Sequence, residues 1–175
     1  MSSEARLAVA CALASATLLC ATSARAEGSA WSYHARGGLA FGWTPGKSSL
    51  MIGIHAGGGP SYESVRMGAD GILALGGGPG GRGFSVYAGG FGTLGVRGPM
   101  APITAVADLH MGPAWFTAQG KGTFETDGWF GGVSGGAVGM DPTARVGFYL
   151  ALTGWLSVSE PRAAPVFVRI GAMRL

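Results

Sequence analysis

The sequence predicts a single all-β domain, an antiparallel up-and-down β-barrel of about eight strands preceded by a signal peptide. Two observations lead to this prediction. Apolar residues alternate with small or polar residues along most of the chain after residue 30, which is the two-residue period of a β-strand. Short turns rich in Gly and Pro separate the alternating stretches, and no amphipathic helical pattern follows the first 26 residues.

Residues 1–26 have the parts of a secretory signal peptide. Arg6 supplies a positive charge, Leu7 to Leu19 form an apolar segment, and Ala24-Arg25-Ala26 fits the small-x-small pattern before a cleavage site. The apolar segment is short for a membrane-spanning helix, which needs about 20 residues. We therefore expect cleavage near Ala26 and a mature β-barrel domain over residues 27–175. An uncleaved anchor helix is the alternative.

Composition excludes several classes of site from the predicted mature chain. Its only cysteines, Cys11 and Cys20, lie within the signal peptide, so a disulfide, a thiolate zinc site and a Cys nucleophile are not expected. Leu19 before Cys20 also argues against lipidation there. The basic residues are scattered and the formal net charge is +3, which argues against nucleic-acid binding.

The first alternating stretch, WSYHARGGLAFGW, indicates what kind of barrel this is. One face carries Trp31, Tyr33, Leu39, Phe41 and Trp43, and the other is small or polar. Twelve steps of about 3.4 Å span about 40 Å, which, tilted by about 40°, crosses the hydrocarbon core of a bilayer. Aromatic rings at both ends of such a strand are typical of the girdles at the two membrane interfaces. We therefore assign Trp31 and Trp43 to aromatic girdles.

The remaining strands are predicted from the same alternation. Two positions interrupt the pattern: Gly71 predicts a bulge with a shift of the apolar phase to Ile72, and Pro113 leaves eight or nine strands open because it cannot donate in a central ladder. The predicted stretches cover residues 48–59, 62–76, 84–96, 103–119, 123–139, 145–159 and 166–175.

The architecture resembles the small eight-stranded outer-membrane β-barrels of Gram-negative bacteria over Trp31 to Leu175. The resemblance implies a cell-envelope protein in the outer membrane, with lipid around the barrel and polar side chains inside it. It also accounts for the 34 glycines, all after residue 26, because large inward side chains need small neighbours. The C-terminus departs from the resemblance: such barrels typically end on an aromatic residue, whereas this chain ends on Leu175, with Arg169 and Gly171 in its phase.

Polar residues on the inward face are the candidate functional residues. His34 stands two residues from Arg36, and Asp108 two residues from His110, so each pair projects to one side of its strand. Such pairs suggest a metal or acid–base site, or a hydrogen-bond network that any closed polar interior requires. The network is favoured, and no catalytic residue, metal or cofactor is expected. Its predicted members are His34, Arg36, His55, Arg66, Asp70, Asp108, His110 and Arg145.

Three functions remain open. The leading hypothesis is a non-enzymatic outer-membrane barrel with a structural or adhesive role, whose partner is outer-membrane lipid. The alternative is a secreted or periplasmic lipocalin-like barrel or sandwich with an apolar ligand inside. The second alternative, a lipid-modifying envelope enzyme, requires Asp108 and His110 to converge with a serine such as Ser64, Ser85 or Ser134 at the barrel rim. The sequence indicates neither an extracellular partner nor an oligomeric state.

Overall fold

A closed β-barrel of eight antiparallel strands makes up the described part of the chain. The computed structural model describes residues 31–44, 49–78, 83–100, 103–119, 123–140, 146–157 and 165–174. The expected signal peptide (1–26) and Arg145 lie outside the described residues. The strands are β1 (Trp31–Thr44), β2 (Ser49–Tyr62), β3 (Val65–Gly77), β4 (Phe84–Met100), β5 (Ile103–Gln119), β6 (Thr123–Met140), β7 (Val146–Ser157) and β8 (Val166–Arg174).

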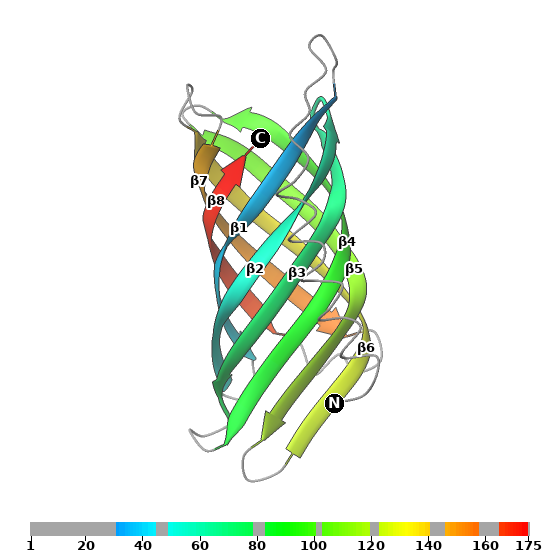
Figure 1. Cartoon of the computed structure of the whole chain (residues 1–175), viewed down its shortest axis with the longest axis vertical. Helices are drawn as coiled ribbons and strands as arrows, with labels where there is room; N and C mark the ends of the chain where they lie inside the picture. Colours follow the sequence, from blue (N-terminus) through cyan, green and yellow to red (C-terminus); the bar gives the residue numbers. More distant parts are fainter. Residues whose placement is uncertain are drawn as a thin grey trace.

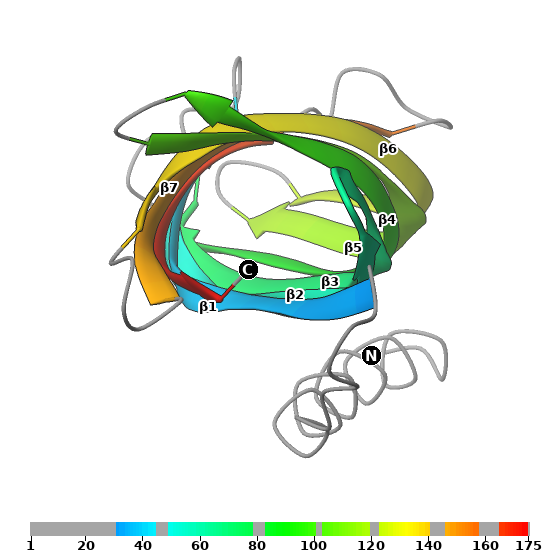
Figure 2. The same ribbon diagram turned by 90° about the horizontal axis from the view of Figure 1, so that it is seen from above.

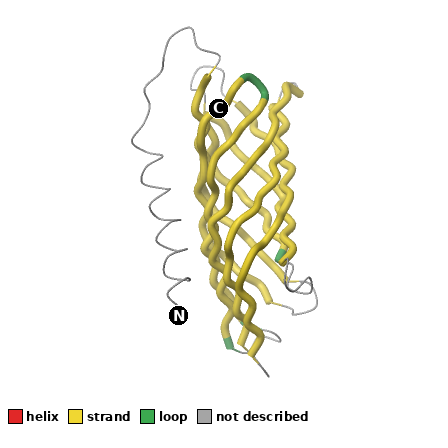
Figure 3. Tube along the Cα trace, turned by 90° about the vertical axis from the view of Figure 1, so that its right-hand side faces the viewer, coloured by secondary structure: helices red, strands yellow, loops and turns green. Residues whose placement is uncertain are grey.

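Each strand pairs with its neighbours in sequence, and β1 pairs with β8 to close the ring (Figure 2). This closure confirms the predicted all-β, antiparallel barrel. The strands are inclined to the long axis of the barrel (Figures 1 and 3). One end of the barrel, the terminal end, carries the start of β1 and the end of β8. The other, the loop end, carries the end of β1 and the start of β8.

The strands have the two unlike faces that their alternation predicts. On β1 the side chains of Tyr33 and Leu39 are 56% and 48% exposed, whereas His34, Arg36 and Ala40 are buried. The same alternation recurs on the other strands, with large apolar side chains outside. The exposed apolar set includes Leu50, Ile52, Ile54, Leu73, Leu75, Leu94, Val96, Leu109, Met111, Val133, Phe148, Leu150 and Leu152.

Pro113 lies within the continuous strand β5, so the number of strands is eight. It pairs with Trp129 on β6. On the other side, the pairing of β5 with β4 passes from Met111 to Ala114 and leaves out Gly112 and Pro113. The ring nitrogen of proline has no hydrogen to donate, and the interrupted ladder avoids the need for one.

The bulge predicted at Gly71 is wrong. Gly71 pairs with Ala56 on β2 and with Gly90 on β4, and the registers on both sides continue without an inserted residue. Ile72 is buried in the same inward phase as Asp70. The sequence pattern changes at this point because the inward face changes from charged to apolar.

The interior of the barrel has an apolar zone at the loop end and a charged zone in the middle. An apolar cluster rich in aromatic rings fills the loop end, and a smaller apolar cluster around Val106, Val138 and Met173 lies towards the terminal end. The charged side chains adjoin this smaller cluster, since Arg66 Nη1 lies 3.7 Å from Met173 Sδ. The aromatic rings at the loop end belong to Tyr87, Phe91, Phe116, Phe130, Trp155 and Phe167.

Candidate functional site

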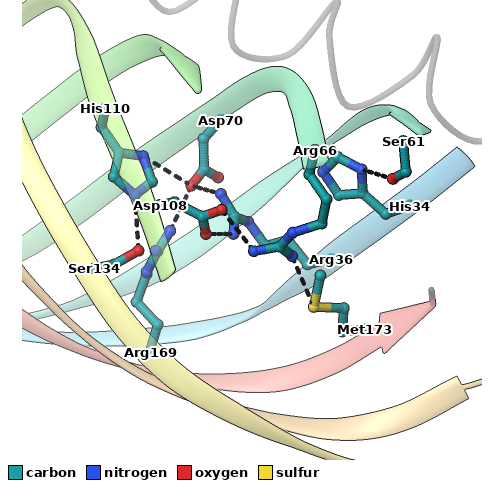
Figure 4. Close-up of polar contacts among 10 residues, drawn as sticks. All are labelled: His34, Arg36, Ser61, Arg66, Asp70, Asp108, His110, Ser134, Arg169 and Met173. Carbon is teal, nitrogen blue, oxygen red and sulfur yellow. Dashed lines mark hydrogen bonds and ion pairs between the residues drawn. The ribbon is translucent and has the colours of Figure 1, made fainter. Parts of the chain in front are cut away.

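Five side chains from four strands form a continuous chain of ion pairs across the middle of the lumen (Figure 4). Asp70 Oδ2 accepts hydrogen bonds from Arg36 Nη2 at 2.9 Å and from Arg169 Nη1 at 2.5 Å. Asp108 accepts from Arg36 Nη1 at Oδ2, 2.5 Å, and from Arg66 Nη2 at Oδ1, 2.6 Å. The order along this ion-pair chain is therefore Arg169, Asp70, Arg36, Asp108, Arg66.

Glycines on the intervening strands let these side chains meet. Arg36 on β1 and Asp70 on β3 both pair with Gly57 of β2, which stands between them. A Cβ atom on Gly57 would lie 2.5 Å from Asp70 Oδ1 and 2.7 Å from a backbone oxygen. The Arg36–Asp70 ion pair therefore spans the whole of β2 at a residue that has no side chain.

The same arrangement occurs two strands further round the wall. Arg66 on β3 and Asp108 on β5 both pair with Gly95 of β4. A Cβ atom on Gly95 would collide with the Asp108 carboxylate. The glycines beside the charges are therefore a steric requirement of the network.

Burial makes the pairing of these charges essential. All five side chains of the ion-pair chain are at least nine-tenths buried. An isolated buried charge is strongly disfavoured, so each carboxylate needs its arginines and each arginine needs its carboxylate. Removing one partner from a buried pair typically costs about 3–5 kcal/mol. The network is therefore a feature on which folding of the barrel depends.

The three histidines are buried but play different parts. His34 Nδ1 lies 3.0 Å from Ser61 Oγ, and His110 Nε2 lies 2.9 Å from Ser134 Oγ. The ring centroid of His55 lies 5.8 Å from that of Tyr149. The histidines therefore extend the polar zone and do not converge on one point.

A serine, a histidine and an aspartate lie next to one another here, as in a catalytic triad: Ser134, His110 and Asp70. Their distances do not fit a triad. His110 Nδ1 lies 3.7 Å from Asp70 Oδ2, beyond hydrogen-bond distance, and that oxygen already accepts from two arginines. All three side chains are at least nine-tenths buried, with the aromatic cluster between them and the loop end. A nucleophile needs contact with substrate, so this arrangement favours a structural hydrogen-bond network.

Seven of the eight residues predicted for the lumen network are buried inside the barrel, and Arg145 lies outside the described residues. Their contacts in the structure differ from the pairs that the sequence spacing suggested. Asp108 binds Arg36 and Arg66, while His110 faces Asp70. The i, i+2 pairs on one strand are about 7 Å apart, so their nearest partners come from other strands.

Sequence reasoning left Arg169 out of the network, although it anchors one end of it. The signal was present, because Arg169 falls in the phase opposite Val166, Val168 and Ile170. Tyr149 was missed too, and its phase on β7 is the same inward one. Ser61 gave no signal, since a serine is common on either face of a strand.

The aromatic cluster closes the lumen at the loop end. The rings of Phe91 and Trp155 are stacked with centroids 3.9 Å apart. Tyr87 contacts Phe167 at 5.2 Å and Phe130 at 5.9 Å between ring centroids. These side chains are at least nine-tenths buried and come from four strands, so they form a packed plug across the barrel.

The outer wall of the barrel carries the apolar side chains. Trp31 and Tyr62 contact each other at the terminal end, with ring centroids 5.1 Å apart, and Trp43 lies at the opposite end of β1. Near the loop end, outward side chains together with Gly76 and Gly77 line a hollow of about 510 Å³. The side chains around it are those of Phe41, Trp43, Leu50, Ile52, Leu75 and Val168.

Comparisons with known proteins leave the site to be interpreted from its own chemistry. Within the described ranges there is no helix of the length and hydropathy that a membrane-spanning helix needs. Those ranges also hold no group of three or more His, Cys, Asp or Glu side chains placed to bind a metal ion. No model of a known protein family matches the chain, and no curated protein matches it.

Proposed function

We propose that this protein is an outer-membrane β-barrel of a Gram-negative bacterium, with a structural or adhesive and non-enzymatic role. In this proposal residues 1–26 direct export and are removed near Ala26. One observation carries the proposal. The outer wall exposes Leu, Ile, Val, Phe and Met side chains around the ring, while three arginines and two aspartates are buried inside. In water this distribution is strongly unfavourable, whereas in a bilayer it is the favourable one.

The dimensions of the strands support the same proposal. The strands have 9 to 18 residues, and a tilted strand crosses a bilayer with about 9–11. In the closed ring every described strand pairs with a neighbour on each side, which satisfies backbone groups along the middle of the wall. Trp31 and Trp43 then act as anchors at the two interfaces.

A structural role fits the packed lumen better than transport does. The ion-pair chain crosses the middle zone and the aromatic plug fills the loop end. An eight-stranded barrel is only wide enough for its own side chains. The partner in this proposal is therefore the surrounding outer-membrane lipid.

The lipocalin-like alternative requires the reverse distribution, with an apolar interior and a polar outer wall. Three arginines and two aspartates in the lumen argue against an apolar ligand there. The lipid-modifying alternative requires an accessible nucleophile, and Ser134 is buried beside His110.

The test is expression of the full chain in a Gram-negative host, followed by separation of the membranes and electrophoresis with and without heating. We expect the protein in the outer-membrane fraction after a carbonate wash, with a mobility that shifts on heating. A control chain that lacks residues 2–26 should fail to reach that membrane. Release of the full chain by salt, without a mobility shift, would overturn the proposal in favour of the lipocalin-like binder.

A further inference from the structure

The ion-pair chain has one positive charge too many. Three arginines share two aspartates, and Asp70 and Asp108 are the only buried carboxylates among the side chains that the structure describes. A buried charge without a counter-charge is strongly disfavoured. An additional negative charge inside the lumen would complete the balance.

Unused hydrogen-bond donors show where this charge would lie. Arg169 donates through Nη1 to Asp70, while its Nε and Nη2 have no partner among the described residues. The Tyr149 hydroxyl is also without a partner there. The Cζ atom of Arg169 lies 5.8 Å from the centre of the Tyr149 ring, and that of Arg36 lies 5.9 Å from it. The unused donors therefore belong to one neighbourhood.

Four strands bring this neighbourhood together. Tyr149 on β7 pairs with Gly171 on β8, Gly171 pairs with Gly38 on β1, and Gly38 pairs with His55 on β2. Tyr149 and His55 thus occupy one row of the wall, and the two positions between them have no side chains. Arg169 stands two residues from Gly171 on the same inward face.

The other end of the ion-pair chain is a weaker candidate. Arg66 Nη1 lies 3.7 Å from Met173 Sδ and its Nη2 binds Asp108, so only Nε lacks a partner. Arg169 offers two adjacent nitrogens on the edge of a planar guanidinium, the geometry with which arginine binds anions.

We propose that the barrel binds one small monovalent anion of the halide class in its lumen, against Nε and Nη2 of Arg169, with the Tyr149 hydroxyl as a further donor. The charge follows from the excess of one positive charge. The small size follows from the burial of Arg169 and Tyr149, both of which are 0% exposed. This proposal concerns the interior of the barrel and does not depend on where the protein resides.

The first test is thermal unfolding of the folded mature barrel in detergent, in sodium bromide or chloride against sodium gluconate at equal ionic strength. A ligand that binds only the folded state raises the unfolding midpoint with its concentration. We expect a rise of roughly 5–10 °C at a hundredfold excess of halide over its Kd, which continues to grow with the logarithm of the halide concentration. Crystals grown in bromide should show an anomalous peak beside Arg169.

Arg169→Met should abolish the halide dependence, because it removes both the excess charge and the main donors. Arg174→Met is the matched control on the same strand, where the side chain is exposed, and it should keep the dependence. Should Arg169→Met fail to fold, Tyr149→Phe removes one donor and should weaken halide binding about tenfold. Equal midpoints in all salts without a bromide peak at Arg169 would overturn the proposal, and so would an unchanged halide response in Arg169→Met or Tyr149→Phe.

Discussion

Arg36 on β1 and Asp70 on β3 form an ion pair at 2.9 Å although the whole of β2 lies between their strands. The pair is possible because β2 contributes only Gly57 at that row. Arg66 and Asp108 repeat the relationship across Gly95. Gly57 and Gly95 thus leave the space in which the buried charges of the flanking strands pair.

Asp70→Asn should destabilise the barrel by about 3–5 kcal/mol, because it leaves Arg36 and Arg169 buried with weakened pairing. The measurement is urea unfolding of the barrel folded into lipid vesicles. Glu125→Gln is the control, since Glu125 is exposed and accepts a hydrogen bond from Trp115 Nε1 at 2.7 Å. This substitution should cost less than about 1 kcal/mol. Equal losses in the two variants would show that the ion-pair chain contributes little.

Gly95→Ala should destabilise the barrel by about 1–3 kcal/mol, the usual range for overpacking. Its Cβ atom would meet the Asp108 carboxylate and lie 2.6 Å from the Ala107 carbonyl oxygen. Gly92 lies on the same strand, and its Cβ would meet only a backbone oxygen at 3.7 Å. Gly92→Ala should therefore be neutral or slightly stabilising in the same unfolding assay. If both variants behave alike, the steric role of Gly95 is refuted.

Met111→Arg tests the environment of the outer wall. Met111 is 62% exposed near the middle of β5. In a bilayer this substitution should cost about 2–4 kcal/mol, whereas at a water-exposed position most substitutions stay within about 0.5 kcal/mol. Met111→Leu is the control that preserves apolar character. A neutral Met111→Arg variant, measured by unfolding from vesicles, would contradict a lipid-facing β5.

Ser134 should not react with fluorophosphonate probes that label serine nucleophiles. The hydroxyl is buried against His110, and the carboxylate beyond it is held by Arg36 and Arg169. The measurement is mass spectrometry of the folded barrel after probe treatment, with Ser134→Ala as the control. Labelling of the native chain that disappears in Ser134→Ala would contradict the non-enzymatic proposal.

Local alternation was sufficient to predict the strands, the kind of closed sheet and the inward and outward faces, except beyond Gly71 on β3. This succeeded because the direction of a side chain on a strand depends only on its parity in the chain. The inward phase of His34, Arg36 and Asp108 follows from this parity. The bulge predicted at Gly71 failed because the pattern there records a change of interior zone, from Asp70 to Ile72, and not a change of backbone geometry.

The contacts between the inward side chains were decided by tertiary structure alone. Asp108 lies two residues from His110 in sequence, but closure of the barrel turns it towards Arg36 and Arg66. Arg169 reaches Asp70 from the far end of the chain for the same reason. The physical cause is that a closed ring brings inward side chains from distant strands to a common centre. There, the partners are selected by the distances across glycine positions and not by the distances along one strand.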